Sequence, residues 1–127
     1  MAEEARHLPY PAPIDAYGKG GFRFAGMSHR GSLLCLPDGI WPWSVARADA
    51  IDEAALAPVF AQAEAIGLFL LGTGRGGWIM PPPLRQRLRA LGIAFETSNT
   101  GSAVSTYNIL LGEGRRVAAG LIADEWA

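Results

Sequence analysis

The chain has 127 residues, half of them hydrophobic and 18% charged, which is enough for one domain with an ordinary core and too little for two. The formal net charge is −1, because a basic stretch at residues 70–116 is offset by acidic residues on either side, so no nucleic-acid partner is expected. A single cysteine excludes an intramolecular disulfide, and no apolar run approaches the roughly 20 residues that span a bilayer, so no direct membrane insertion is expected.

The N-terminal residues lack a sustained hydrophobic period. Residues 1–20 carry prolines at 9, 11 and 13 and glycines at 18 and 20, which predicts an extended arm ahead of an α/β domain at residues 21–127. In that domain, the alternation at Phe22–Phe24 and the apolar run at Ser32–Leu36 predict two strands. Turn-forming residues at Ser28–Gly31 separate them, so the two strands are expected to form an antiparallel hairpin.

A tight turn at Asp38-Gly39 is predicted to lead into a strand at residues 40–45. Pro42 cannot donate a hydrogen bond to a neighbouring strand, which places this strand at a sheet edge or makes it irregular. Trp41 and Trp43 are two residues apart and share one face, as core residues or as aromatic anchors of an interface. Because four tryptophans are hard to bury in so small a chain, we expect this strand to support a homo-oligomer, with a dimer favoured.

The middle of the chain predicts a helix followed by a buried strand. Asp52 suits the N-cap position, and Leu56 and Val59 follow the spacing of one buried helical stripe. Pro58 lacks a backbone donor, which predicts that the regular part of this helix begins there. Residues 66–71 are apolar without alternation, a pattern typical of a strand covered on both faces.

Two further helices and two strands are predicted in the last third. Leucines at helical spacing in residues 84–91 predict a short helix that stops at Gly92, and a strand follows at residues 93–95. Thr100 is expected to cap a helix that ends near residues 112–114.

A final strand is predicted at residues 116–122, and short right-handed crossovers would make the last strands parallel. The predicted fold class is therefore α/β. It is a single compact domain whose mixed β-sheet joins N-terminal antiparallel hairpin strands to a C-terminal β-α-β-α-β part.

Residues 72–77 spell G-x-G-x-x-G after the buried strand, and Glu96 follows at about the spacing of a ribose-binding acid. A dinucleotide site also needs a helix to open at the third glycine, so that its free amides face the pyrophosphate. Here Trp78–Met80 and three prolines intervene. The motif therefore favours a glycine-rich turn, and we expect no cofactor.

The same loop follows the carboxyl end of a parallel strand, where open α/β sheets place their ligand crevices. A small anion or carboxylate could be held there by Thr73, Gly74, Arg75, Thr100 and Asn108, with free loop amides and the Arg75 guanidinium as donors. For Asn108 a structural role is favoured, because buried amides usually serve backbone groups. In that role Asn108 ties its helix to a neighbouring loop.

No catalytic or metal-binding set emerges from the sequence. His7 and His29 have no further ligand at suitable spacing. Cys35 lies in an apolar strand, where burial would raise its pKa and make it inert. Glu96 is the one carboxylate expected near the loop, whereas acid–base chemistry normally needs a tuned partner as well. We therefore predict no metal site and no catalytic residue.

Four short motifs resemble one known family. They lie at residues 70–74 (LLGTG), 96–100 (ETSNT), 106–111 (TYNILL) and 113–115 (EGR). Over about residues 21–122 the chain resembles the Mth938-like family, formerly domain of unknown function 498, which is related to mitochondrial complex I assembly factor 3. The resemblance implies a compact α/β domain with a mixed sheet, and a protein partner in the assembly of a membrane complex.

Two functional hypotheses follow. The favoured one is a small, non-catalytic accessory protein that acts in protein interaction or assembly, as the resemblance implies. The alternative is a small-molecule binding protein or enzyme that uses a cleft beside residues 72–77.

The acidic N-terminus lacks a targeting pattern, and ten arginines against one lysine are typical of GC-rich coding, so a bacterial cytoplasmic protein is expected.

Overall fold

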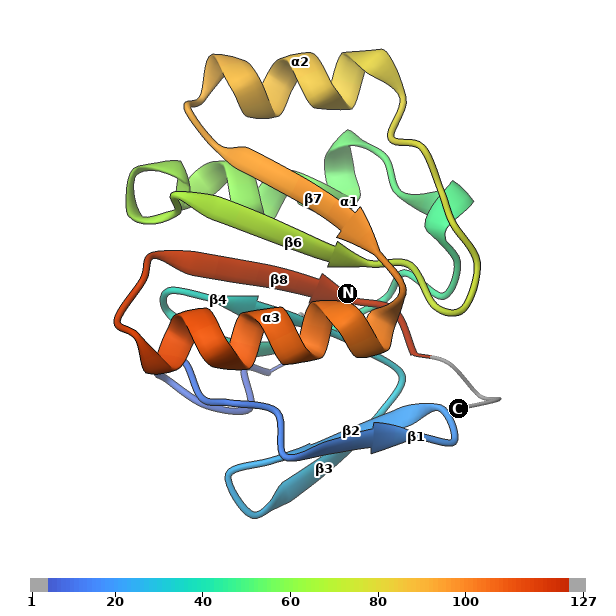
Figure 1. The fold of residues 1–127 in the computed structure, drawn as a ribbon, viewed down its shortest axis with the longest axis vertical. Coiled ribbons are helices and arrows are strands. Elements are labelled where there is room, and N and C mark those ends of the chain that lie inside the picture. The colour runs from blue at the N-terminus through green and yellow to red at the C-terminus, as the bar shows by residue number, and fades with distance from the viewer. Residues whose placement is uncertain (1–4, 124–127) are drawn as a thin grey trace.

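The computed structural model describes residues 5–123, which form one five-stranded sheet, one three-stranded sheet and three α-helices (Figure 1). The larger sheet has the strand order β5-β4-β8-β6-β7. Its strands are β4 (Ser32–Leu36), β5 (Gly39–Trp43), β6 (Leu68–Gly72), β7 (Ala94–Ser98) and β8 (Val117–Leu121). Strand β6 pairs in parallel with β7 and β8, whereas β4 is antiparallel to β5 and β8. The predicted fold class, a single α/β domain with a mixed sheet, is confirmed.

The smaller sheet is antiparallel and consists of β1 (Ala16–Gly18), β2 (Gly21–Phe24) and β3 (Met27–Arg30). The predicted pairing of Phe22–Phe24 with Ser32–Leu36 was wrong, because β2 pairs with β1 and β3 instead. The turn lies at Ala25-Gly26, whose φ values are +50° and +75°. Three of the residues expected to form the turn, Ser28–Arg30, lie in strand β3 instead. Alanine rarely adopts a positive φ, so its sequence gives no signal of this turn.

Strand β5 lies at one edge of the five-stranded sheet, as Pro42 predicted. Its edge is partly covered, because the Ile40 amide and carbonyl exchange hydrogen bonds with Leu8. The turn before it is formed by Pro37 and Asp38, and Gly39 already pairs with Leu36. Gly39 has a φ of +141°, and a Cβ there would clash with the Leu8 carbonyl oxygen, so this position requires glycine.

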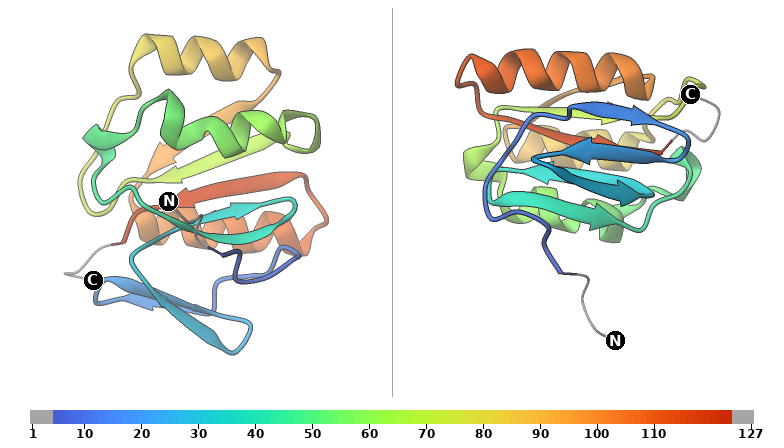
Figure 2. Two further views of the ribbon diagram at one scale, coloured as in Figure 1. Left: turned by 180° about the vertical axis from the view of Figure 1, so that it is seen from behind. Right: turned by 90° about the horizontal axis from the view of Figure 1, so that it is seen from below.

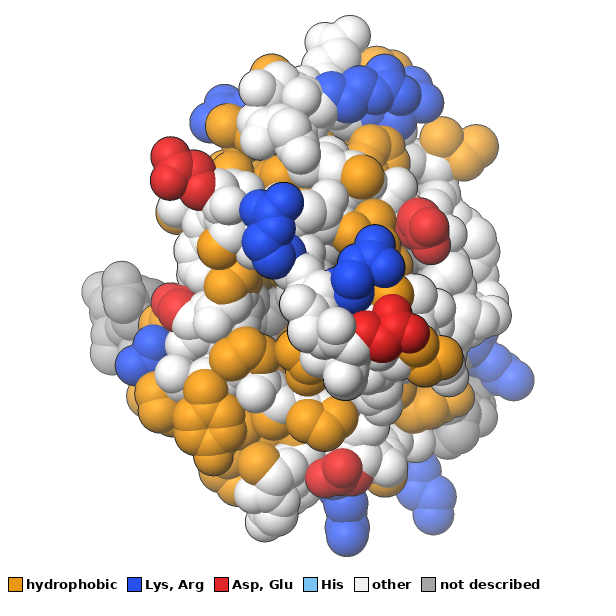
Figure 3. All heavy atoms as spheres, turned by 60° about the vertical axis from the view of Figure 1, so that its left-hand side comes forward, with side chains coloured by type: hydrophobic (Ala, Val, Ile, Leu, Met, Phe, Trp, Pro, Cys, Tyr) orange, Lys and Arg blue, Asp and Glu red, His pale blue; other side chains and the backbone are white. Residues whose placement is uncertain are grey.

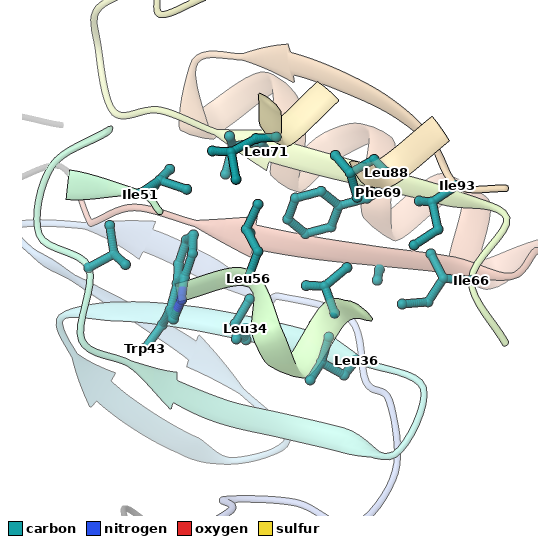
Figure 4. Close-up of a cluster of buried hydrophobic side chains, with 14 of the residues drawn as sticks. Leu34, Leu36, Trp43, Ile51, Leu56, Ile66, Phe69, Leu71, Leu88 and Ile93 are labelled. Carbon is teal, nitrogen blue, oxygen red and sulfur yellow. The ribbon is translucent and has the colours of Figure 1, made fainter. Parts of the chain in front are cut away.

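The two faces of the five-stranded sheet carry different helices. Helices α1 (Glu53–Ala61) and α2 (Pro82–Ala90) cover one face, and α3 (Thr100–Gly112) covers the other (Figure 2). On the α1 and α2 side, Phe69 and Leu71 of β6 meet Leu56 of α1 and Leu88 of α2 in an apolar cluster (Figure 4). Leu70 points to the α3 side. Strand β6 is therefore buried on both faces, as predicted.

The N-terminal arm closes the α3 side. Residues 5–15 contain no helix or strand apart from the bridge at Leu8, yet Leu8, Ala12 and Ile14 are buried in the same cluster as Leu70 and Tyr107. Strand β1 lies within residues 1–20, which the sequence assigned to an extended arm. The described part of this segment is thus mostly extended, and it packs as part of the core.

The helix termini partly follow the prediction. Asp52 caps α1 by accepting a hydrogen bond from the Ala55 amide at 2.9 Å, as expected. The helix then runs through Pro58, so the prediction that its regular part begins there was wrong. Inside the helix the missing donor of Pro58 removes a single backbone hydrogen bond, and the helix tolerates this loss. Gly92, with a φ of +77°, follows the end of α2 as predicted.

Candidate functional site

The candidate site lies at the carboxyl ends of β6 and β8, the edge where α/β sheets place ligand crevices. A cleft of about 550 Å³ opens there. Its walls come from the loop after β6, the end of β8, and the segments that precede β4 and follow β5. These segments converge because β8 sits between β6 and β4 in the sheet. The loop at residues 73–75 contributes Thr73, Gly74 and Arg75, so three of the predicted site residues lie together.

Thr73 anchors the glycine-rich loop. It is 8% exposed, and its amide donates to the Ser98 carbonyl oxygen at 2.9 Å. Its hydroxyl Oγ1 lies 2.7 Å from the Gly76 carbonyl oxygen and 3.1 Å from that of Ser98, and shares its proton between them. The Thr73 side chain therefore holds the loop closed against the end of β7.

Gly74 and Thr100 bind each other. The Thr100 amide donates to the Gly74 carbonyl at 2.9 Å, and the Gly74 amide donates to Thr100 Oγ1 at 2.8 Å. Thr100 Oγ1 in turn donates to the Ile122 carbonyl at 2.7 Å. These two amides were expected to hold an anion, but both already have acceptors within the fold. The Thr100 hydroxyl links the loop after β6, the start of α3 and the end of β8.

Thr100 is not the cap of α3. Asn99 occupies the N-cap position, and its Oδ1 accepts a hydrogen bond from the Ser102 amide at 2.8 Å. The prediction that Thr100 caps this helix was wrong, because the preceding Asn99 is also a favourable N-cap residue. Thr100 becomes the first helical residue because its side chain turns inward, and it is only 2% exposed. Gly72 permits this close approach, since a Cβ there would lie 2.8 Å from the Thr100 Cα.

Asn108 lies apart from the cleft and binds the N-terminal arm. Its Nδ2 donates to the Ile14 carbonyl at 2.8 Å, and its Oδ1 accepts from the Ile14 amide at 2.8 Å. The neighbouring Tyr107 hydroxyl donates to the Ala12 carbonyl at 3.1 Å. The side chain of Asn108 thus makes the two backbone hydrogen bonds that a neighbouring strand would otherwise make with Ile14. This is the structural role that the sequence favoured for Asn108.

Two arginines of the cleft were not singled out from the sequence. Arg30, at the end of β3, and Arg47, after β5, line the cleft together with Arg75. Arg47 also forms an exposed ion pair with Asp49 at 2.6 Å. No local motif links these three residues, because they are far apart in sequence and only the fold brings them together. The cleft is basic, and its described lining contains no Asp or Glu.

The G-x-G-x-x-G loop does not open a helix. Helix α2 begins at Pro82, and Pro81, Pro82 and Pro83 occupy its N-cap and first two positions. Proline has no backbone N–H, so these positions supply no donor to a pyrophosphate. This geometry agrees with the sequence argument against a dinucleotide site.

Trp41 and Trp43 share one face of β5, but both are largely covered. Trp43 is 7% exposed, and its Nε1 donates to the Ala55 carbonyl of α1 at 3.1 Å. Trp41 is half-buried, its Nε1 donates to Asp38 Oδ1 at 2.8 Å, and the Arg6 guanidinium lies 5.5 Å from its ring centre. Self-association through this strand stays a prediction, and the burial of Trp43 leaves Trp41 as its main candidate contact.

The buried thiol of Cys35 faces the α3 side of the sheet. Burial raises the pKa of Cys35 to about 12, and a hydrogen bond with Tyr107 opposes that rise only in part. Burial, and then the neighbouring Cys35, raise the pKa of Tyr107 well above its ordinary value. Both groups therefore stay neutral at physiological pH.

Within residues 5–123, no group of three or more His, Cys, Asp or Glu residues is arranged to hold a metal ion.

The fold and the site together define a class of protein. It is a single-domain α/β protein with a mixed sheet, in which polar side chains of the motifs form hydrogen bonds with the protein's own backbone. Residues 14–122 match the model of a family described as a protein of unknown function, DUF498/DUF598, and the chain belongs to this family. A solved Mth938-like domain from Bordetella pertussis shares the fold, with a TM-score of 0.78 and 25% identity over 98% of this chain and 94% of that one.

Curated relatives include an uncharacterised protein of Rhodobacter capsulatus, 43% identical over 87% of this chain and 83% of the relative. The mouse NADH dehydrogenase [ubiquinone] 1 alpha subcomplex assembly factor 3 is 32% identical over 91% of this chain. The chain spans only 62% of that mouse protein.

Two solved bacterial structures resemble the chain more strongly. A protein of Bartonella henselae, described as an outer membrane protein, has a TM-score of 0.89 and 44% identity over 93% of this chain and 99% of its own. The Rpa2829 protein of Rhodopseudomonas palustris has a TM-score of 0.82 and 51% identity over 97% of this chain and 93% of its own. In residues 5–123 of the present chain, no helix is long and apolar enough to cross a membrane.

Proposed function

We propose that this protein is a non-catalytic accessory protein that acts in the assembly of a respiratory NADH dehydrogenase. The observation that carries the proposal is the 32% identity to the mouse complex I assembly factor over nearly the whole of this chain. The alignment extends over 115 residues, which is 91% of this chain.

The internal hydrogen bonds support an interaction role over a catalytic one. Thr73, Thr100 and Asn108 are three of the polar residues in the motifs that mark the family, and each makes hydrogen bonds within the fold. Residues of this kind would face a substrate in an enzyme. Here they hold a loop, a helix start and the arm in place, as expected if the motifs maintain a surface for another protein.

Exposed apolar side chains provide further contact area. Ile79 is 84% exposed, Ile109 61% and Tyr10 54%. In the face shown in Figure 3, hydrophobic side chains gather on the lower part, over the N-terminal arm, among scattered charges.

The proposed location is the bacterial cytoplasm, and the proposed assembly is a dimer that also binds a protein partner.

The alternative, a small-anion site beside residues 72–77, has lost two of its expected donors to internal hydrogen bonds. The Thr73 amide and hydroxyl also donate to backbone carbonyls within the fold, so the site stays a prediction with Arg75 as its candidate cation. Thermal-shift titration with phosphate and simple carboxylates tests it. A concentration-dependent rise in the midpoint that Arg75→Ala abolishes would support it, and no shift with any of them would remove it.

Affinity purification of the tagged protein from its own cells tests the proposed function. Mass spectrometry of the eluate identifies both co-purifying proteins and extracted small molecules. The proposal predicts subunits of the NADH dehydrogenase above the level in a mock purification, and no stoichiometric metabolite. Recovery of a metabolite without any protein partner would contradict it and favour the binding-protein alternative.

A further inference from the structure

The two histidines of the chain, His7 and His29, meet in the fold. His7 Nε2 lies 3.0 Å from His29 Nδ1, and the centres of the two rings are 4.8 Å apart. The sequence predicts no metal site, because neither histidine has a further ligand near it in the chain. The fold supplies that ligand by bringing together two residues that are 22 positions apart. Imidazole nitrogens are the commonest metal ligands in proteins, so this pair is a candidate for chelation.

The separation of the two nitrogens suits two ligands of one metal ion. Bonds between a metal ion and imidazole are about 2.1 Å long, so two nitrogens at a right angle lie about 3.0 Å apart, whereas a tetrahedral angle separates them by about 3.4 Å. The distance between His7 and His29 therefore matches square-planar or tetragonal coordination, the geometries of Cu²⁺ and Ni²⁺. The ring centres also lie closer together than they would if the two nitrogens pointed straight at each other. The rings are thus inclined to the line between the nitrogens, as an ion bound beside that line requires.

Neighbouring groups hold both rings in place. His29 Nε2 lies 3.1 Å from the Ser32 carbonyl oxygen, and because a carbonyl only accepts, Nε2 carries the proton and Nδ1 of the neutral ring has the lone pair. Metal-binding histidines commonly donate their second N–H to such a group, which orients the ring. His7 packs against Phe24, with ring centres 5.6 Å apart, and its amide donates to the Ile40 carbonyl at 2.8 Å.

Binding an ion needs only a change of tautomer in His7. In the described fold the hydrogen bond between the rings places the proton of neutral His7 on Nε2, which donates to His29 Nδ1. When that proton moves to Nδ1 of His7, both facing nitrogens present lone pairs, and no proton is released. Residues 5–123 contain no group of three or more His, Cys, Asp or Glu placed to hold an ion. Water would therefore complete the coordination, and the ion would stay exchangeable.

We propose that His7 and His29 together bind one divalent transition-metal ion, with Cu²⁺ bound most tightly. Cu²⁺ leads the affinity order of the divalent first-row metals at nitrogen ligands. The ion would link the N-terminal arm to β3 of the three-stranded sheet and stabilise the fold, because it binds the folded chain in which the two rings meet. Neither histidine lines the cleft at the carboxyl ends of β6 and β8, so the inference is independent of the proposed function.

Calorimetric titration with Cu²⁺ at pH 7 measures the binding, and electron paramagnetic resonance counts the coordinated nitrogens. His7→Phe keeps an aromatic ring against Phe24 but removes one ligand, and His29→Gln removes the other. Each variant should weaken binding by at least about tenfold, since losing a group that only orients a ligand already costs about 10–100-fold. Glu113→Gln, at an exposed carboxylate after α3, is the control and should bind as the wild type does.

Thermal unfolding with Ni²⁺ gives a second readout. Excess Ni²⁺ should raise the midpoint of the wild type and not that of His7→Phe, and EDTA should reverse the rise. Binding should weaken at pH 5, because a protonated imidazole has no lone pair for the ion.

Four results would overturn the inference. They are no Cu²⁺ binding by the wild type, wild-type affinity in both histidine variants, an equal loss in Glu113→Gln, and a Cu²⁺ spectrum without two coordinated nitrogens. The last result is read in the wild type alone, so it decides the question even if a histidine variant fails to fold.

Discussion

The two faces of the five-stranded sheet are closed in different ways. On the α1 and α2 face, Phe69 and Leu71 meet apolar side chains of two helices (Figure 4). On the α3 face, Leu70 is covered by one helix and by the N-terminal arm, which has no regular structure of its own at residues 8–14. The first face is held by packing, and the second also depends on the polar side chains that fix the arm.

This difference explains the polar motif of α3. An arm without a strand partner must satisfy its backbone groups in another way when it is buried. Asn108 binds both the amide and the carbonyl of Ile14, and Tyr107 binds the Ala12 carbonyl. The T-Y-N motif therefore determines how the arm closes the sheet. The cleft at the carboxyl ends of β6 and β8 has none of these residues in its lining.

The largest expected effect comes from a charge on the strand that both faces cover. Leu70 is 2% exposed, so Leu70→Asp would bury an unpaired carboxylate and unfold the domain. Circular dichroism and thermal melting measure this. Ile79→Asp, at a position that is 84% exposed, is the control and should leave the midpoint nearly unchanged. A soluble Leu70→Asp protein with the wild-type midpoint would contradict the central position of β6.

Truncating a buried side chain on the α1 and α2 face should lower the free energy of unfolding less than Leu70→Asp does, but still by several kcal/mol. Phe69 is fully buried between α1, α2 and the sheet, and Phe69→Ala should lower the free energy of unfolding by about 3–5 kcal/mol. Urea unfolding measures the loss. Leu91→Ala, at a position that is 37% exposed, serves as the comparison. Equal losses in the two variants would show that this face is not the closely packed one.

On the α3 face, Asn108→Ala should lower the free energy of unfolding by about 1–3 kcal/mol, because it leaves both backbone groups of Ile14 without their partner. Tyr107→Phe removes one neutral hydrogen bond and should cost about 1 kcal/mol. Urea unfolding of both variants gives the ranking. A larger loss for Tyr107→Phe than for Asn108→Ala would reverse the proposed importance of the two residues.

The packed face was also the more predictable one from the sequence. Leu56 and Val59 at helical spacing, the Asp52 cap and the apolar run before Gly72 each report a local preference, and the structure confirms them. The arm and the turn at Ala25 depend on distant contacts or on an unfavourable φ, which no local pattern records.

The candidate site was partly predictable for the same reason. The loop at residues 73–75 follows a strand end and could be placed from its sequence. Arg30 and Arg47 reach the same cleft only through the order of the strands in the sheet. The hydrogen bonds that occupy the Gly74 and Thr100 amides also require the folded chain.

The titration of Cys35 is expected to affect stability only at high pH. Its pKa is raised from 9.0 to about 12 in the fold, so the neutral thiol contributes stability below pH 9 that is lost as the pH rises toward 12. Cys35→Ala should therefore lose stability less steeply above pH 9, by up to about 1.4 kcal/mol per pH unit. Urea unfolding at neutral pH and above pH 9 compares the slopes. Parallel slopes in the two proteins would show that the thiol does not titrate in this way.

Hydrogen exchange at Ile14 tests the central claim most directly, because its amide donates to the side chain of Asn108. The account predicts a slowly exchanging Ile14 amide in the wild type, rapid exchange in Asn108→Ala, and unchanged protection of Phe69 in both proteins. An Ile14 amide that exchanges at the rate of an unprotected peptide in the wild type would contradict the account, since the arm would then not be held by the motif of α3.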